Sequence, residues 1–143
     1  MLKITTRDFG ETEIDESTII TMPNGIIGFE STKRYTLISP LGEDKFPMWL
    51  QSVDSVEPCF VVYDPMQIDN SYCFEISDEE QALLKIDENS PYRVLCVAIV
   101  PDDYRKTTIN LRCPIIVNTR ENLAAQVILA ENYEFKCPIY EEG

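Results

Sequence analysis

The side chains that could do chemistry in this 143-residue sequence are carboxylates and thiols, because it contains 25 Asp and Glu and five Cys but no His. Without an imidazole, Ser-His-Asp and Cys-His mechanisms are excluded. A helix N-terminus could activate a cysteine, but the clearest helix start, after Ser77, carries acids that would raise the pKa of a thiol. We therefore predict no catalytic residue; an enzyme that uses carboxylates alone, as glycosidases do, stays an alternative hypothesis.

The same side chains lack the spacing of a metal or cofactor site. The cysteines are widely separated and include no C-x-x-C pair: Cys59, Cys73, Cys96, Cys113 and Cys137. This pattern fits neither a zinc ribbon nor a disulfide framework, and reduced thiols favour a cytoplasmic location. Adjacent acids such as Asp102 and Asp103 lack the glycine and the spaced oxygen ligands of a calcium loop. Residues 25–30 contain glycines without the P-loop lysine. We predict no metal and no cofactor.

The distribution of charge gives the strongest indication of a binding surface. The net charge of -13 would repel a polyanion, so we expect no direct nucleic-acid partner. Residues 64–88 contain eight acids and one base, which is over half of the excess charge. Aromatic side chains within a ring of charge are typical of protein–protein contacts, although an acidic cap over ordinary core residues is the alternative. The candidates for a protein contact are Tyr72, Phe74, Glu75, Asp78 and Glu79.

These residues must be positioned by short elements, because nine prolines divide the chain into segments that suit strands better than long helices. The segments with strand signals are 34–38, 48–52, 59–63, 92–100, 107–113, 115–118 and 126–129. The apolar run 94–100 predicts a central strand covered on both faces. Alternation in 107–113 predicts a half-exposed strand, with Ile109, Leu111 and Cys113 on one face and Thr108, Asn110 and Arg112 on the other.

One helix is predicted to begin after Ser77, because Glu80 follows it at capping-box spacing, and residues 120–124 fit either a second short helix or a loop. Many short strands with one short helix favour a mainly β fold, a compact antiparallel β-barrel of one domain over residues 1–143. A β-sandwich is the alternative. No stretch approaches the length of a membrane span, and we expect no membrane association.

Four segments together cover nearly the whole chain: Gly25 to Glu30, Trp49 to Ser52 leading to Phe60 and Asp64-Pro65, Asn110 to Asn118, and Gln126 to Leu129 followed by Tyr133 and Pro138. In these four segments the sequence resembles the flagellar assembly factor FliW family. The third segment is the most specific. The family often has alanine where this sequence has Cys113, which is a small substitution of a buried type.

The resemblance implies a cytoplasmic β-barrel without enzymatic activity that binds two proteins in turn. One is flagellin before its export, and the other is the RNA-binding translational repressor CsrA. Binding of flagellin would leave CsrA free to repress flagellin translation, so that translation is coupled to secretion.

Because CsrA binds RNA and should carry basic surface, we assign its contact to the acidic candidates above, with Glu75 and Asp78 as the leading charges. For flagellin we expect a hydrophobic groove near Ile26, Phe29 and Phe46. We expect a monomer when free. A β-barrel that binds a small ligand is the alternative function.

Overall fold

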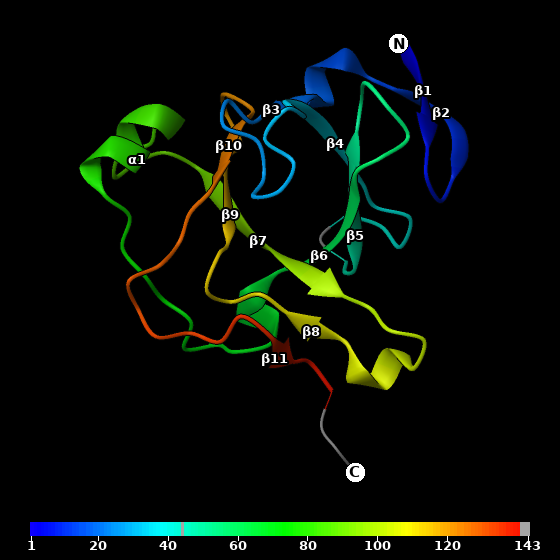
Figure 1. Ribbon diagram of the computed structural model, residues 1–143. Coiled ribbons are helices and arrows are strands. Elements are labelled where there is room, and N and C mark those ends of the chain that lie inside the picture. The colour runs from blue at the N-terminus through cyan, green and yellow to red at the C-terminus, as the bar shows by residue number, and fades with distance from the viewer. Residues whose placement is uncertain (44, 141–143) are drawn as a thin grey trace.

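The computed structural model describes residues 1–43 and 45–140 (Figure 1). In chain order its strands (β), α-helix (α) and 3-10 helices (η) are β1 (Leu2–Thr6), β2 (Gly10–Ile14), η1 (Glu16–Thr18), β3 (Ile20–Thr21), β4 (Arg34–Ile38), β5 (Met48–Ser52), β6 (Cys59–Tyr63), η2 (Pro65–Gln67), α1 (Asp78–Leu84), β7 (Tyr92–Ile99), η3 (Tyr104–Lys106), β8 (Thr108–Ile109), β9 (Ile115–Asn118), β10 (Leu123–Gln126) and β11 (Cys137–Pro138).

Seven strands close a barrel in the order β7, β6, β5, β4, β3, β10, β9, and β9 pairs again with β7. The pairs are antiparallel except for β3 with β10, which run parallel and share the register pair Leu123–Thr21. Strands β8 and β11 extend from β7 outside the ring. The predicted mainly β barrel with one short helix is therefore confirmed, with one parallel pair among its antiparallel neighbours.

Side chains of the barrel strands alternate between two apolar clusters. Leu95 and Val97 of β7 point into the barrel, whereas Val94 and Cys96 point outward under α1 and the C-terminal segment. The inner cluster receives side chains from all seven strands: Ile20, Tyr35, Leu37, Met48, Leu50, Phe60, Val62, Leu95, Val97, Ile115, Val117 and Ala124, with Met22, Ile26 and Phe46 from loops. The predicted coverage of β7 on both faces is confirmed for residues 94–97, while Ile99 is more than half exposed.

The predicted strand over 107–113 is wrong in its length, because the chain leaves the sheet after Ile109. The Asn110 carboxamide oxygen accepts hydrogen bonds from the backbone N–H groups of Arg112 and Cys113, both at 3.0 Å. This local turn replaces the ladder that a strand would need. The predicted alternation is nevertheless right, since Ile109, Leu111 and Cys113 are buried, and Ile109 and Leu111 belong to the cluster outside the barrel.

The predicted strand over 126–129 is also misplaced, because β10 spans Leu123–Gln126. Beyond Gln126 the N–H groups of Val127 and Leu129 donate to the carbonyls of Pro114 and Arg112. No backbone N–H answers them, because Pro114 has none and the Arg112 N–H donates to Asn110 Oδ1; instead the Arg112 Nε donates to the Leu129 carbonyl at 2.7 Å. The start of β10 also excludes a second helix over 120–124.

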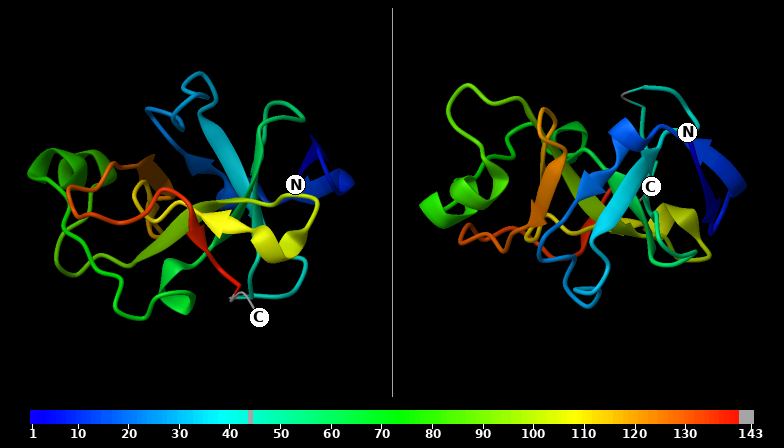
Figure 2. Two further views of the ribbon diagram at one scale, coloured as in Figure 1. Left: turned by 60° about the horizontal axis from the view of Figure 1, so that its bottom comes forward. Right: turned by 90° about the horizontal axis from the view of Figure 1, so that it is seen from above.

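The helix and the N-terminal hairpin lie on opposite sides of the barrel (Figures 1 and 2). Helix α1 begins as predicted, with the Ser77 hydroxyl accepting from the Glu80 N–H and the Glu80 carboxylate accepting from the Ser77 N–H. Strands β1 and β2 form a separate two-stranded sheet that packs on Val53. Within the described ranges, no helix is long and apolar enough to span a bilayer.

Candidate protein-binding surface

The candidate surface is built on residues 64–77, which run from the end of β6 to the start of α1. Tyr72 anchors this segment: its hydroxyl donates to the Leu111 carbonyl at 2.6 Å, and its ring centroid lies 4.5 Å from that of Tyr133. The Tyr133 hydroxyl in turn accepts from the Cys73 N–H and donates to the Cys73 carbonyl. Because Tyr72 is buried, it supports the surface from below, and Phe74, partly buried beside it, forms part of that support.

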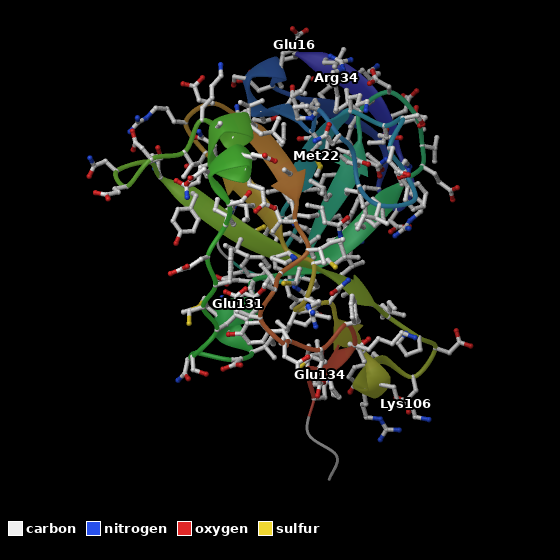
Figure 3. The ribbon with its side chains drawn as sticks, turned by 60° about the vertical axis from the view of Figure 1, so that its left-hand side comes forward. Glu16, Met22, Arg34, Lys106, Glu131 and Glu134 are labelled. Carbon is white, nitrogen blue, oxygen red and sulfur yellow. The ribbon has the colours of Figure 1, made fainter. Side chains whose placement is uncertain are left out.

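The charged candidates Glu75, Asp78 and Glu79 are exposed. Figure 3 views the molecule with α1 toward the reader. The N–H of Glu75 donates to the Glu131 carboxylate at 3.1 Å. Asp78 and Glu79 follow in the first turn of α1, where carboxylates interact favourably with the helix dipole. The structure thus places the three predicted acids on a fixed segment of backbone.

The end of α1 is held by a buried side chain that the sequence did not single out for this role. Asn118, at the end of β9, donates from Nδ2 to the carbonyls of Leu84 at 2.8 Å and Lys85 at 3.2 Å. Its Oδ1 accepts from the N–H groups of Arg120 and Glu121. Each polar atom of the Asn118 side chain is therefore engaged, and α1 is tied to the barrel wall.

A pocket of about 820 Å³ opens beside these residues, between segment 64–77, α1 with the loop that follows it, and β7. We call it the α1 pocket. It is lined by Phe46, Asp64, Met66, Tyr72, Cys73, Phe74, Ile76, Gln81, Ile86, Asp87, Glu88, Tyr92, Arg93, Val94, Ile116 and Thr119. Tyr72 and Phe74 were expected here from the sequence. Tyr92 and Ile86 were missed, although an aromatic residue at a strand start could have indicated an exposed contact.

The α1 pocket carries negative charge at its edge. Its lining residues include three acids, Asp64, Asp87 and Glu88, and one base, Arg93. Hydrogen bonds from the Asn89 N–H and from Ser90 lower the pKa of Asp87, so this carboxylate is ionised at neutral pH. An apolar interior with an acidic edge can accept a ligand that is both apolar and cationic.

The three residues expected to form a second groove do not share one. Phe46 lines the α1 pocket, whereas Ile26 lies beside Phe60 in a separate hollow of about 380 Å³. We call this the Phe60 groove, and it also contains Ile27, Ile99 and Phe135, each more than half exposed. Phe29 is 44% exposed and its ring packs edge-on against Phe60, with centroids 5.3 Å apart.

The turn that precedes this groove depends on Gly25. Its φ of +66° suits glycine, and a Cβ at this position would lie 2.7 Å from the Cα of Glu30. The turn buries Ile26 in the inner cluster and leaves Ile27 outside. The glycine therefore shapes a backbone turn.

The thiols do not form a site. No group of three or more metal-ligating side chains occurs among the described residues. Burial raises the pKa of Cys59 to about 11 and of Cys96 to about 12, so both thiols stay protonated at neutral pH.

Comparison with known proteins gives consistent matches over nearly the whole chain. The model of the family described as "FliW protein" matches residues 3–139. A flagellar assembly factor FliW of Ruminiclostridium cellulolyticum is 39% identical over 140 residues, which cover 97% of this chain and 95% of the relative. Another, of Natranaerobius thermophilus, is 37% identical and covers 99% and 94%. A crystal structure of the flagellar assembly factor FliW superimposes with a TM-score of 0.90 at 30% identity, covering 98% of each chain.

Proposed function

This chain belongs to the FliW family, and we propose that it is a cytoplasmic flagellar assembly factor that acts by binding proteins, without catalysis. Its partners in this proposal are flagellin, towards which it acts as a chaperone, and CsrA, which it antagonises. Each partner lowers the apparent affinity of the other, so the free flagellin concentration sets how much CsrA is sequestered.

The observation that carries the CsrA assignment is the group of exposed acids at the start of α1 and in the segment before it. Glu75, Asp78 and Glu79 project from a backbone segment that hydrogen bonds hold in place. A translational repressor needs basic surface to bind RNA, and complementary charge accelerates encounter and selects the partner. In this proposal Tyr72 and Phe74 position the acids from below.

The charge-reversed variant Glu75→Lys/Asp78→Lys tests this assignment. We expect its affinity for CsrA to fall by at least about tenfold in calorimetric titrations, because two attractive charges become repulsive. The matched control Glu11→Lys/Glu16→Lys makes the same change in net charge on the hairpin and η1, away from α1 (Figures 1 and 3). Equal affinity of the two variants, both folded, would remove the assignment.

For flagellin we propose contact at the Phe60 groove, supported by the exposed rings and aliphatic side chains around it. Phe29 would touch the partner, and Ile26 would support the groove from beneath. Phe46 faces the α1 pocket and is left out of this contact. Titration of Phe29→Glu with flagellin tests the assignment: we expect weakened binding, with CsrA binding unchanged.

A further inference from the structure

We propose that the α1 pocket receives an apolar side chain from a basic segment of the partner protein, while lysine or arginine neighbours of that side chain lie on the acids at the edge. This inference rests on the proposed function and adds to it the kind of segment that is recognised. The exposed acids alone would attract any cation. The pocket adds a requirement for an apolar residue between the cations.

The inside of the pocket is apolar and its edge presents adaptable hydrophobic side chains. Tyr72, Val94 and Ile116 belong to the outer apolar cluster that lies beneath it. At the edge, Met66 is 49% and Tyr92 is 60% exposed. Exposed methionine and tyrosine beside a hollow are typical of protein-binding surfaces, because both offer apolar area that can adjust to a ligand.

The charge around the pocket determines which apolar segment can enter. Asp64, Asp87 and Glu88 outnumber Arg93 in the lining, and Asp87 and Glu88 are exposed. A segment with acidic neighbours would be repelled and a segment with basic neighbours attracted. The pocket volume of about 820 Å³ falls in the range of hollows that take specific ligands.

The pocket walls are held in place before a partner arrives. Tyr133 makes two hydrogen bonds to the backbone of Cys73 on one wall, and Asn118 holds the end of α1 on the other. Little ordering of the protein is then needed on binding, which favours recognition of a short segment.

The test fills the pocket and reverses its charge separately. Cys73 is exposed at the lining, so Cys73→Trp places an indole into the opening. Glu88 is exposed, and Glu88→Lys changes only the edge. Glu11→Lys is the charge control, because Glu11 belongs to β2, which lies on the opposite side of the barrel from α1 (Figures 1 and 2). Circular dichroism checks the fold; if Cys73→Trp does not fold, wild-type protein alkylated at Cys73 replaces it, with Cys73→Ser as the unreactive control.

Two probes are titrated into these proteins: CsrA, and a synthetic peptide with one leucine flanked by lysines, compared with its glutamate-flanked counterpart. If CsrA binds the wild type, we expect its affinity to be at least about tenfold lower for the protein with the filled pocket and for Glu88→Lys. Glu11→Lys should bind CsrA as the wild type does. Wild-type affinity with the filled pocket would overturn the inference and leave the proposed function standing.

If CsrA does not bind the wild type, the proposed function falls and the peptide decides on the pocket. Binding of the lysine-flanked peptide that is lost on filling the pocket, with no binding of the glutamate-flanked one, would support the pocket as a site for basic apolar segments. Equal binding of the two peptides, or binding of neither, would overturn it.

Discussion

Two buried tyrosines differ in what their hydroxyl groups contact. The Tyr72 hydroxyl donates to the Leu111 carbonyl, whereas the Tyr35 hydroxyl has no hydrogen-bond partner among the described residues. Burial raises the pKa of Tyr35 to about 12, and the Thr32 side chain lowers this pKa by a smaller amount. Burial also raises the pKa of Tyr72. Removing the two hydroxyls should therefore have different effects on stability.

We expect Tyr72→Phe to lower the free energy of unfolding by about 1–2 kcal/mol, because it leaves a buried carbonyl without its donor. Tyr35→Phe removes an unpaired buried polar group and should change it by less than about 0.5 kcal/mol, or raise it. Urea unfolding of the two variants measures both values. A larger loss for Tyr35→Phe than for Tyr72→Phe would contradict this account of the core.

The buried thiols predict a loss of stability at alkaline pH. Burial raises the pKa values of Cys59 and Cys96 from 9.0 to about 11 and about 12. The folded state keeps both protons above pH 9, where the unfolded chain loses them. Their contribution is therefore complete below pH 9 and is lost as the pH rises through the folded values.

We expect urea midpoints to fall between about pH 9 and pH 11, and to fall less steeply for Cys59→Ala/Cys96→Ala than for the wild type. The cavities left by the two substitutions lower the urea midpoint at every pH. The informative quantity is therefore the slope of the midpoint against pH. Parallel slopes for the two proteins would show that other groups control the alkaline loss.

At the scale of elements, local signals in the sequence located most of the barrel. The predictions for β4, β5, β6 and β9 match the observed bounds, because each is a short apolar or alternating run. The capping box at Ser77 likewise located α1. The turn at Asn110 shortened β8 because a side chain took the hydrogen bonds of the ladder.

Elements that depend on distant partners were not predicted. Strand β3 has two residues and gains its place from pairing with β4 and β10. The β1–β2 hairpin is rich in polar residues, although the alternation of Ile4 and Ile14 with charged neighbours could have indicated it. The same holds for the α1 pocket: its acids and aromatics were visible in the sequence, but Tyr92 and Ile86 reach it through tertiary packing.

Helix α1 has seven residues and should depend on Asn118 for its position. Asn118→Asp keeps the oxygen that accepts from residues 120 and 121 but places a second oxygen against the Leu84 and Lys85 carbonyls. We expect it to cost about 2–3 kcal/mol and to increase amide exchange across 78–85, with β4 and β5 unaffected. The exposed Asn89→Asp is the control. Unchanged protection of α1 in Asn118→Asp would show that apolar packing alone holds the helix.

At the scale of the whole molecule, the two proposed contacts lie on separate hollows, the α1 pocket and the Phe60 groove, which have no lining residue in common. Exclusion of one partner by the other then requires either large partners that overlap above the barrel or a change in the barrel itself. Because acids line the α1 pocket and no acid among the described residues lines the Phe60 groove, we expect the proposed CsrA contact to be the more sensitive of the two to salt.

We propose that the protein binds CsrA and flagellin in turn. Calorimetric titration with CsrA, alone and after saturation with flagellin, at low and moderate salt, tests this proposal most directly. We predict binding to CsrA that weakens with salt and disappears when flagellin is bound. Equal CsrA binding with and without flagellin, or no binding to either protein, would contradict the proposal and leave the fold and the family unchanged.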